Sequence, residues 1–194
     1  MATTRSTTSS STPERSLCAS PATASVVACG VPSSHPPAGR DAAAVRTAAR
    51  AVLLRDDALL VVRIRTQEGE FLVLPGGGQE HGETLTDTVR REVMEELGLT
   101  VAPRGLMYVR EYVGKNHAMH RIHGHFHQVE AVFHCECADF GPIGEGRAQD
   151  RRQVGFEWLP LAKLGDFPLS PPGLGQVIDR FLASGSATYL GDVH

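Results

Sequence analysis

The stretch from Gly77 to Leu99, G-G-Q-E-H-G-E-T-L-T-D-T-V-R-R-E-V-M-E-E-L-G-L, joins a glycine-rich turn to a short segment that is dense in carboxylates. Thr84 suits the N-cap of a helix, and Asp87 resembles the acidic partner of a capping box. Gly98 suits the C-cap, because glycine adopts the left-handed conformation that commonly ends a helix. The sequence therefore predicts a helix from about Leu85 to Leu97.

Three glutamates of this helix lie on or beside the face that packs against the protein. That face is marked by an apolar stripe with a spacing of four residues, namely Leu85, Val89, Val93 and Leu97. Measured from the first of these at about 100° per residue, Glu96 falls at about 20°, Glu92 at about 340° and Glu95 at about 280°. Burying a carboxylate costs several kcal/mol unless it is paired, protonated or bound to a metal. The helix therefore needs a nearby cation.

Two kinds of cation can meet this need, an arginine side chain or a bound metal ion. Arg90 and Arg91 can form ion pairs with the glutamates, and Arg91 can also pair with Glu83 and brace the turn. Two arginines do not neutralise the whole cluster, however, so we favour a divalent metal ion over a network of ion pairs alone. Ligands that are all oxygen atoms suit Mg²⁺ or Mn²⁺ better than zinc.

The same stretch matches the pattern G-x5-E-x7-R-E-U-x-E-E-x-G-U, in which U is aliphatic. The matching residues, with both spacers at the expected length, are Gly77, Glu83, Arg91, Glu92, Val93, Glu95, Glu96, Gly98 and Leu99. This pattern is the Nudix box, and the chain therefore resembles the Nudix hydrolases of the MutT type.

The resemblance implies a fold, an activity and a set of site residues. The implied fold is α+β, a Nudix-type α/β/α sandwich with a mixed β-sheet between helices. The implied metal ligands are Glu92, Glu95, Glu96 and the backbone carbonyl of Gly76, which precedes the box. The residues that support the site structurally are Gly77, Glu83, Arg91 and Gly98.

Length and composition limit the class of protein. The chain has 194 residues, a net charge of −3 and four cysteines. It shows no basic patch for nucleic acid and no apolar run near the ~20 residues of a membrane helix. Cys135 and Cys137 are two apart on an expected strand, which is poor geometry for a disulfide between them. We expect a reduced, cytoplasmic protein.

The chain divides into three parts by composition. Residues 1–45 are rich in Ser, Thr, Ala and Pro, which predicts a disordered tail, and residues 186–194 are expected to form a C-terminal tail. Residues 46–185 form the expected Nudix domain. Within it, the sequence predicts a hairpin around Asp56 and Asp57, a short third strand before Pro75, later strands and a closing helix; these later elements lie near 101–113, 123–137, 156–161 and 173–185.

Several side chains on the strand near 123–137 are candidates for function. His123, His125 and His127 alternate and should share one face, which is either a polar surface or a zinc site, and we prefer the polar surface. A third alternative is that His127 or a neighbour contacts the phosphate or the base of the substrate. Glu130 falls on the other face in apolar company. It is either a further metal ligand or general base, or one half of a structural ion pair, and Glu111 and Glu136 are weaker candidates. A glutamate of the box, Glu92 or Glu95, is the other candidate for the general base.

The expected reaction is hydrolysis of the diphosphate linkage of a nucleoside diphosphate derivative, with Mg²⁺ or Mn²⁺ as cofactor and water as nucleophile. Side chains that can hold phosphate are Arg110, Lys115, Arg121 and His127. Family branches that act on ADP-ribose often carry a proline beyond the box, and branches that act on dinucleoside polyphosphates carry a tyrosine somewhat further on. Val113 and Lys115 occupy these approximate places here, so neither marker is matched. Nucleoside triphosphates, nucleotide sugars and modified nucleotides therefore stay open.

Two other functions stay open as well, a non-catalytic nucleotide sensor on the same fold and a zinc-binding module built on the histidines. The expected partner is a small-molecule nucleotide, with no membrane and no nucleic acid. A homodimer is also open.

Overall fold

The computed structural model describes residues 44–66, 69–117, 121, 124–144 and 152–193. The expected disordered tail lies almost entirely outside the described residues. The strands are β1 Arg46–Arg55, β2 Ala58–Thr66, β3 Gly69–Val73, β4 Gly76–Gly78, β5 Val101–Val113, β6 His127–Cys137, β7 Gln153–Pro160, β8 Leu169–Ser170 and β9 Thr188–Asp192. The helices are α1 Leu85–Leu97, α3 Leu174–Ser184 and the short 3₁₀ helices η1 Gly114–Asn116 and η2 Leu161–Asp166. None of the described helices is long and apolar enough to span a membrane.

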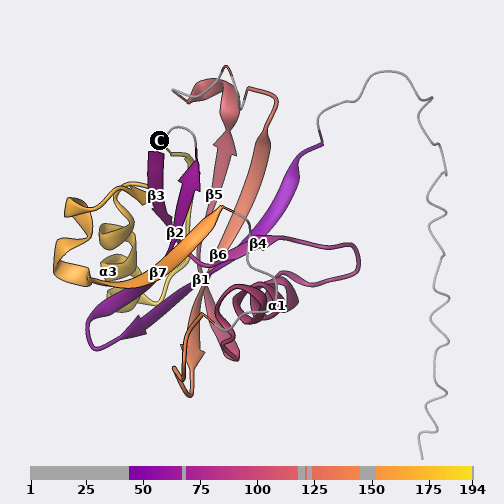
Figure 1. Cartoon of the computed structure of the whole chain (residues 1–194). Helices are drawn as coiled ribbons and strands as arrows, with labels where there is room; N and C mark the ends of the chain where they lie inside the picture. Colours follow the sequence, from indigo (N-terminus) through magenta and orange to yellow (C-terminus); the bar gives the residue numbers. More distant parts are fainter. Residues whose placement is uncertain (1–43, 67–68, 118–120, 122–123, 145–151, 194) are drawn as a thin grey trace, which may run out of the picture. The chain divides into compact units, whose positions relative to one another are not determined.

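The strands form one mixed sheet in the order β8-β3-β2-β1-β6-β5-β9, while β4 pairs with β1 and β7 pairs with β2. β1 runs parallel to β6 and antiparallel to β2 and β4. The two main helices lie on opposite sides of this sheet, α1 on one side and α3 on the other (Figure 1). The α+β sandwich that the resemblance implied is confirmed.

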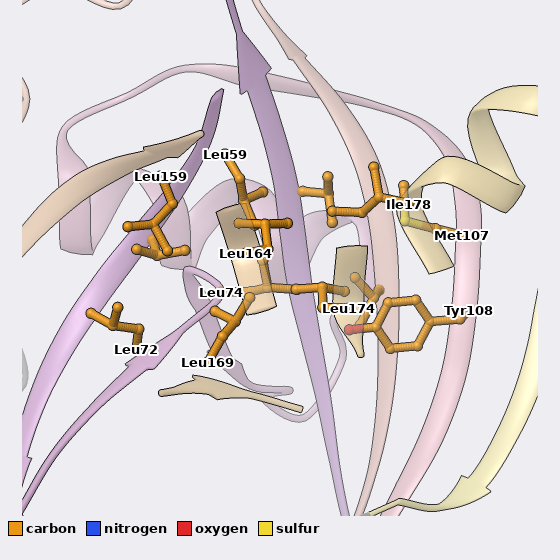
Figure 2. Packing of buried hydrophobic residues seen from close by; sticks show 13 residues of the cluster. Leu59, Leu72, Leu74, Met107, Tyr108, Leu159, Leu164, Leu169, Leu174 and Ile178 are labelled. Carbon is orange, nitrogen blue, oxygen red and sulfur yellow. The ribbon is translucent and has the colours of Figure 1, made fainter. Parts of the chain in front are cut away.

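β1 contributes to a hydrophobic core on each side of the sheet, because successive side chains of a strand point to opposite faces. Ala51 and Leu53 pack in the cluster that contains the buried stripe of α1. Val52 packs in the cluster that contains Leu174 and Ile178 of α3. Figure 2 shows this second cluster, in which Met107 and Tyr108 of β5 also lie. The central strand thus holds α1 and α3 in fixed positions relative to the sheet.

The hairpin expected around the acidic turn is present. β1 ends at Arg55 and β2 begins at Ala58, and the two residues between them, Asp56 and Asp57, have φ values of 49° and 58°. Two consecutive residues with positive φ are typical of the tight turns that match the twist of a hairpin, and Asp tolerates this conformation better than most residues.

The C-terminal end of the chain differs from the expected tail. Within residues 186–194, Thr188–Asp192 forms β9, which pairs in parallel with β5. This strand covers the outer edge of β5, and Leu190 packs against the second core cluster. An uncovered sheet edge exposes unpaired backbone groups, so the short strand stabilises the end of the sheet.

Candidate active site

Helix α1 has the bounds and caps that the sequence predicts. The Thr84 side chain accepts a hydrogen bond from the Asp87 backbone, the Asp87 side chain accepts one from the Thr84 backbone, and Gly98 adopts the left-handed conformation. Val89, Val93 and Leu97 are buried against the sheet. This packing fixes the rotation of the helix and directs its glutamates toward β4.

Two glycines of β4 allow its backbone to lie close to both β1 and α1. Gly76 has φ of 130°, and a Cβ there would lie 2.3 Å from the carbonyl oxygen of Ala49, so no other residue fits without a shift. A Cβ on Gly77 would lie 2.6 Å from the carboxylate of Glu92. Glycine at position 76 therefore lets β4 lie close to the backbone of β1, and glycine at position 77 lets the β4 backbone approach the Glu92 carboxylate.

Glu96 and Arg50 hold Gly76 from two directions. The backbone N–H of Gly76 donates to Oε2 of Glu96 at 2.9 Å. Nη1 of Arg50 donates to the carbonyl oxygens of Gly76 and Leu74, both at 2.9 Å, and Nε of Arg50 donates to Glu130 at 3.0 Å. The orientation of the Gly76 carbonyl is therefore set by the Arg50 guanidinium.

Arg91 connects the turn to the helix glutamates. It forms a bidentate pair with Glu83, at 2.6 and 3.0 Å, and it also donates to the Gly78 carbonyl at 2.9 Å. The same guanidinium reaches Glu92 at 2.9 Å and Glu95 at 3.2 Å. The pair with Glu83 that the sequence suggested is present, and it braces the turn.

The electrostatics of this cluster leave an excess of negative charge. Hydrogen bonds from Arg91 hold the pKa of Glu83 down, at about 2. Burial raises the pKa of Glu92, although Arg91 opposes that change. The Arg91 guanidinium thus contacts three carboxylates, and Glu96 adds a fourth, which interacts electrostatically with Arg50. The ion pairs that the sequence suggested are therefore present, and the metal site stays a prediction.

The residues present fit a hard divalent cation. The candidate ligands are the carboxylates of Glu92, Glu95 and Glu96 and the backbone carbonyl of Gly76, all of them oxygen ligands of the kind that Mg²⁺ and Mn²⁺ prefer. The Gly76 N–H donates to Glu96 at 2.9 Å, which holds this part of β4 beside the carboxylates. Among the described residues no three acidic, His or Cys side chains are already arranged as a closed metal cage. Binding a cation thus requires Glu92 and Glu95 to reorient from Arg91.

Glu130 is enclosed by donors. Its two carboxylate oxygens accept from Arg50 at 3.0 Å, from Arg110 at 2.6 Å and from the Gln128 amide at 2.7 Å, and the residue is 2% exposed. Burial alone would raise the pKa of Glu130, but the two guanidiniums outweigh it and hold the pKa below the usual value. These contacts are those of a structural ion pair, the second of the two roles considered for this residue.

The four phosphate-binding candidates do not converge. Arg110 and Glu130 form a buried pair on one face of β5 and β6. His127 and Glu111 occupy the alternate positions of the same two strands, so their hydrogen bond, at 2.8 Å, lies on the opposite face. Lys115 lies on η1 and Arg121 beyond it, and both are exposed. Of the four, only Arg110 is linked to Gly76, through Glu130 and Arg50.

The expected row of three histidines on one strand is not formed as predicted. β6 begins at His127, and His125 lies before it in a turn, exposed to solvent. His123 lies outside the described residues. The strand is shorter than its alternating pattern indicated because Gly124 and His125 turn the chain before the ladder begins.

Arg50 is the site residue that the sequence reading missed. A signal was available, because Arg50 alternates with Ala48 and Val52 inside the apolar run A-A-R-A-V-L-L, where a charged residue on an inward face needs a partner. The partner itself, Glu130, is distant in the sequence, and only the parallel pairing of β1 with β6 brings the two together.

The chain matches the model of the NUDIX domain over residues 44–181. It therefore belongs to the NUDIX domain family, and with it to the hydrolases that act on pyrophosphate bonds. A search of curated protein sequences finds no match.

Solved structures with the same fold include three that illustrate the range of the family. A NUDIX hydrolase from Nitrosomonas europaea has a TM-score of 0.58 and 23% identity, covering 72% of this chain and 90% of that one. A MutT NUDIX hydrolase from Burkholderia pseudomallei has a TM-score of 0.53 and 25% identity, with coverage of 66% and 92%. An ADP-ribose pyrophosphatase from Streptococcus suis has a TM-score of 0.54 and 20% identity, with coverage of 76% and 100%.

Proposed function

We propose that the protein is a Mg²⁺- or Mn²⁺-dependent pyrophosphohydrolase that cleaves the diphosphate linkage of a small nucleoside diphosphate derivative. The observation that carries this proposal is the contact between α1 and β4, where Glu92 and Glu96 lie against Gly77 and Gly76. All glutamates of the box are present, and the negative charge around them exceeds that of Arg91.

Three roles are divided among the residues of the site in the proposed reaction, and Glu95 takes part in two of them. The carbonyl of Gly76 and the carboxylates of Glu92, Glu95 and Glu96 hold the cation, which when bound neutralises phosphate charge and lowers the pKa of water. Arg91 holds Gly78 and Glu83 and so keeps the turn in place while the glutamates reorient.

We assign the acceptance of the water proton to a carboxylate of the box. Glu95 has a single contact to Arg91, at 3.2 Å, and its side chain is 37% exposed, so water reaches it directly. Glu130 is less suited to this role, because both of its oxygens accept from buried or half-buried donors. Its proposed role is to position Arg50, which in turn orients the Gly76 carbonyl.

The alternative is a Nudix-fold protein that binds a nucleotide without cleaving it. Its binding surface would use the same turn, but the density of carboxylates at α1 would have no purpose in holding a polyanionic ligand, because like charges repel. The intact box therefore favours the enzyme.

The experiment that separates the two is release of phosphate or pyrophosphate from a panel of nucleoside triphosphates, nucleotide sugars and ADP-ribose, with Mg²⁺ and with Mn²⁺. The enzyme predicts metal-dependent turnover of one substrate far above the rest. Binding of a nucleotide without turnover, by a folded protein across the whole panel, would support the sensor instead.

A further inference from the structure

Four side chains form a continuous row at one end of the sheet, and we call them the cation–aromatic row. The guanidinium of Arg46 lies over the ring of Phe126, 5.4 Å from its centroid. Phe126 meets Tyr112 edge to face at 5.9 Å between centroids, and Tyr112 stacks on His117 at 4.0 Å. The row joins the start of β1 to the tips of β5 and β6.

The Arg46 end of the row touches the turn of the active site. A Cβ on Gly78 would lie 2.9 Å from Nη2 of Arg46, and the carbonyl of Gly78 accepts a hydrogen bond from Arg91. A cavity of about 290 Å³ adjoins this contact and is lined by residues 45–47 and 78–81. A ligand whose phosphates lie at β4 therefore has room to extend one arm toward Arg46.

The other end of the row is fixed by the C-terminal strand. The carboxylate of Asp192 accepts from the Val113 backbone at 3.0 Å, from Asn116 at 2.7 Å and from the His117 ring at 2.9 Å. These contacts hold His117 against Tyr112, so the rings are ordered before any ligand arrives. A preorganised surface binds more tightly because less freedom is lost on binding.

The row and the cavity share Arg46, and their combined composition matches one class of ligand. Rings and a guanidinium stack on flat π-systems, and Gln79, His81 and Thr47 at the cavity offer hydrogen-bonding groups for a polar edge. A nucleobase has both a π-face and a polar edge, whereas a sugar or a bare phosphate arm has no π-face. The contacts of Asp192 already hold η1 in place at one end of the row. The exposed Arg46 of β1, at the other end, is not needed for that purpose.

We propose that the cation–aromatic row, through Arg46 and Phe126, is the site that binds the nucleobase of the substrate. This proposal rests on the proposed function, because it takes the phosphates to lie at β4. Stacking of a base on such side chains contributes about 1–3 kcal/mol, which corresponds to roughly a 5- to 150-fold change in affinity.

The test measures binding without turnover. AMP, GMP, CMP and UMP are titrated by calorimetry against the full chain, with ribose 5-phosphate as the ligand that lacks a base. Arg46→Ala is compared with Arg55→Ala, since Arg55 lies at the opposite end of β1 and stacks on Trp158 at 4.2 Å. Phe126→Leu is compared with Phe156→Leu on β7, a phenylalanine that is 37% exposed.

The proposal predicts that at least one nucleoside monophosphate binds more tightly than ribose 5-phosphate. Arg46→Ala and Phe126→Leu should weaken that binding roughly 5- to 150-fold and leave both ribose 5-phosphate binding and the melting temperature unchanged. Arg55→Ala and Phe156→Leu should bind as the wild type does. Equal effects within each matched pair, or monophosphates that bind no better than ribose 5-phosphate, would overturn it. The proposed function is tested separately by turnover, so either idea can fail alone.

Discussion

Replacing Glu130 by Gln should destabilise the fold far more than an ordinary loss of a surface charge. The Glu130 side chain is 3% exposed and lies between Arg110, at 8%, and Arg50, at 21%. Glutamine keeps the shape but removes the carboxylate that, among the described residues, pairs with both of these guanidiniums. Removing one partner of a buried ion pair costs about 3–5 kcal/mol, because the remaining charge is left buried and uncompensated.

Urea denaturation followed by circular dichroism measures this change directly. For a domain of this size each kcal/mol lowers the melting temperature by about 2–4 °C, so the loss should also be plain in a thermal scan. The matched control is Glu136→Gln on the same strand, whose pair with Arg104 is 58% exposed on both sides. That exposed pair should contribute less than about 1 kcal/mol.

The result also separates the two roles of Glu130. Turnover measured well below the melting temperature should fall only moderately in Glu130→Gln, because Arg50 loses one anchor but keeps its bonds to Gly76 and Leu74. Unchanged stability together with a loss of kcat of about 100-fold or more would refute the ion-pair account and make Glu130 the general base.

Three further predictions test other parts of the molecule. Gly77→Ala should abolish most turnover, because the new Cβ would lie 2.6 Å from the Glu92 carboxylate. In the control variant Gly175→Ala the nearest atom is 3.5 Å from the new Cβ, so this change should stabilise α3 by about 0.5–1 kcal/mol and leave turnover unchanged. Equal turnover in the two variants would contradict this prediction. Burial would raise the pKa of Asp192, but hydrogen bonds from Asn116 and the Val113 backbone lower this pKa to about 2. The contribution of the Asp192 carboxylate to the free energy of unfolding is therefore complete above the unfolded pKa, near 3.9, and is lost as the pH falls toward 2. Acid unfolding should therefore be less steep between about pH 4 and 2 in Asp192→Asn, and identical profiles would show that the carboxylate contributes nothing. Removing residues 1–40 should leave turnover and melting temperature within error of the full chain, since their composition cannot form a core; a large loss in either would contradict it.

The features that could be predicted from the sequence are those with local causes. α1 begins and ends where Thr84 and Gly98 require, because caps act on their own backbone within one turn of helix. The pair between Arg91 and Glu83 is likewise local, since both residues lie in the same turn-and-helix unit. The fixed spacing of the box is therefore enough to predict the helix bounds and this ion pair, without knowledge of any tertiary contact.

The features that were missed depend on contacts between distant segments. β9 is a short strand whose sequence is unremarkable alone, and its formation depends on the free edge of β5. The role of Arg50 depends on the parallel pairing that brings Glu130 beside it. The expected histidine row was wrong at His125 because periodicity does not reveal where a ladder begins.

The central claim is that the glutamates of α1 hold the cation that hydrolysis requires. Its most direct test is Mn²⁺ binding, followed by electron paramagnetic resonance, together with turnover of the best substrate in wild type, Glu96→Gln and Glu136→Gln. We predict that the wild type and Glu136→Gln bind Mn²⁺ and turn over alike, whereas Glu96→Gln loses most of both at an unchanged melting temperature. The claim would be contradicted if turnover persisted in excess chelator. It would also be contradicted if the Glu96→Gln variant bound Mn²⁺ and hydrolysed substrate as the wild type does.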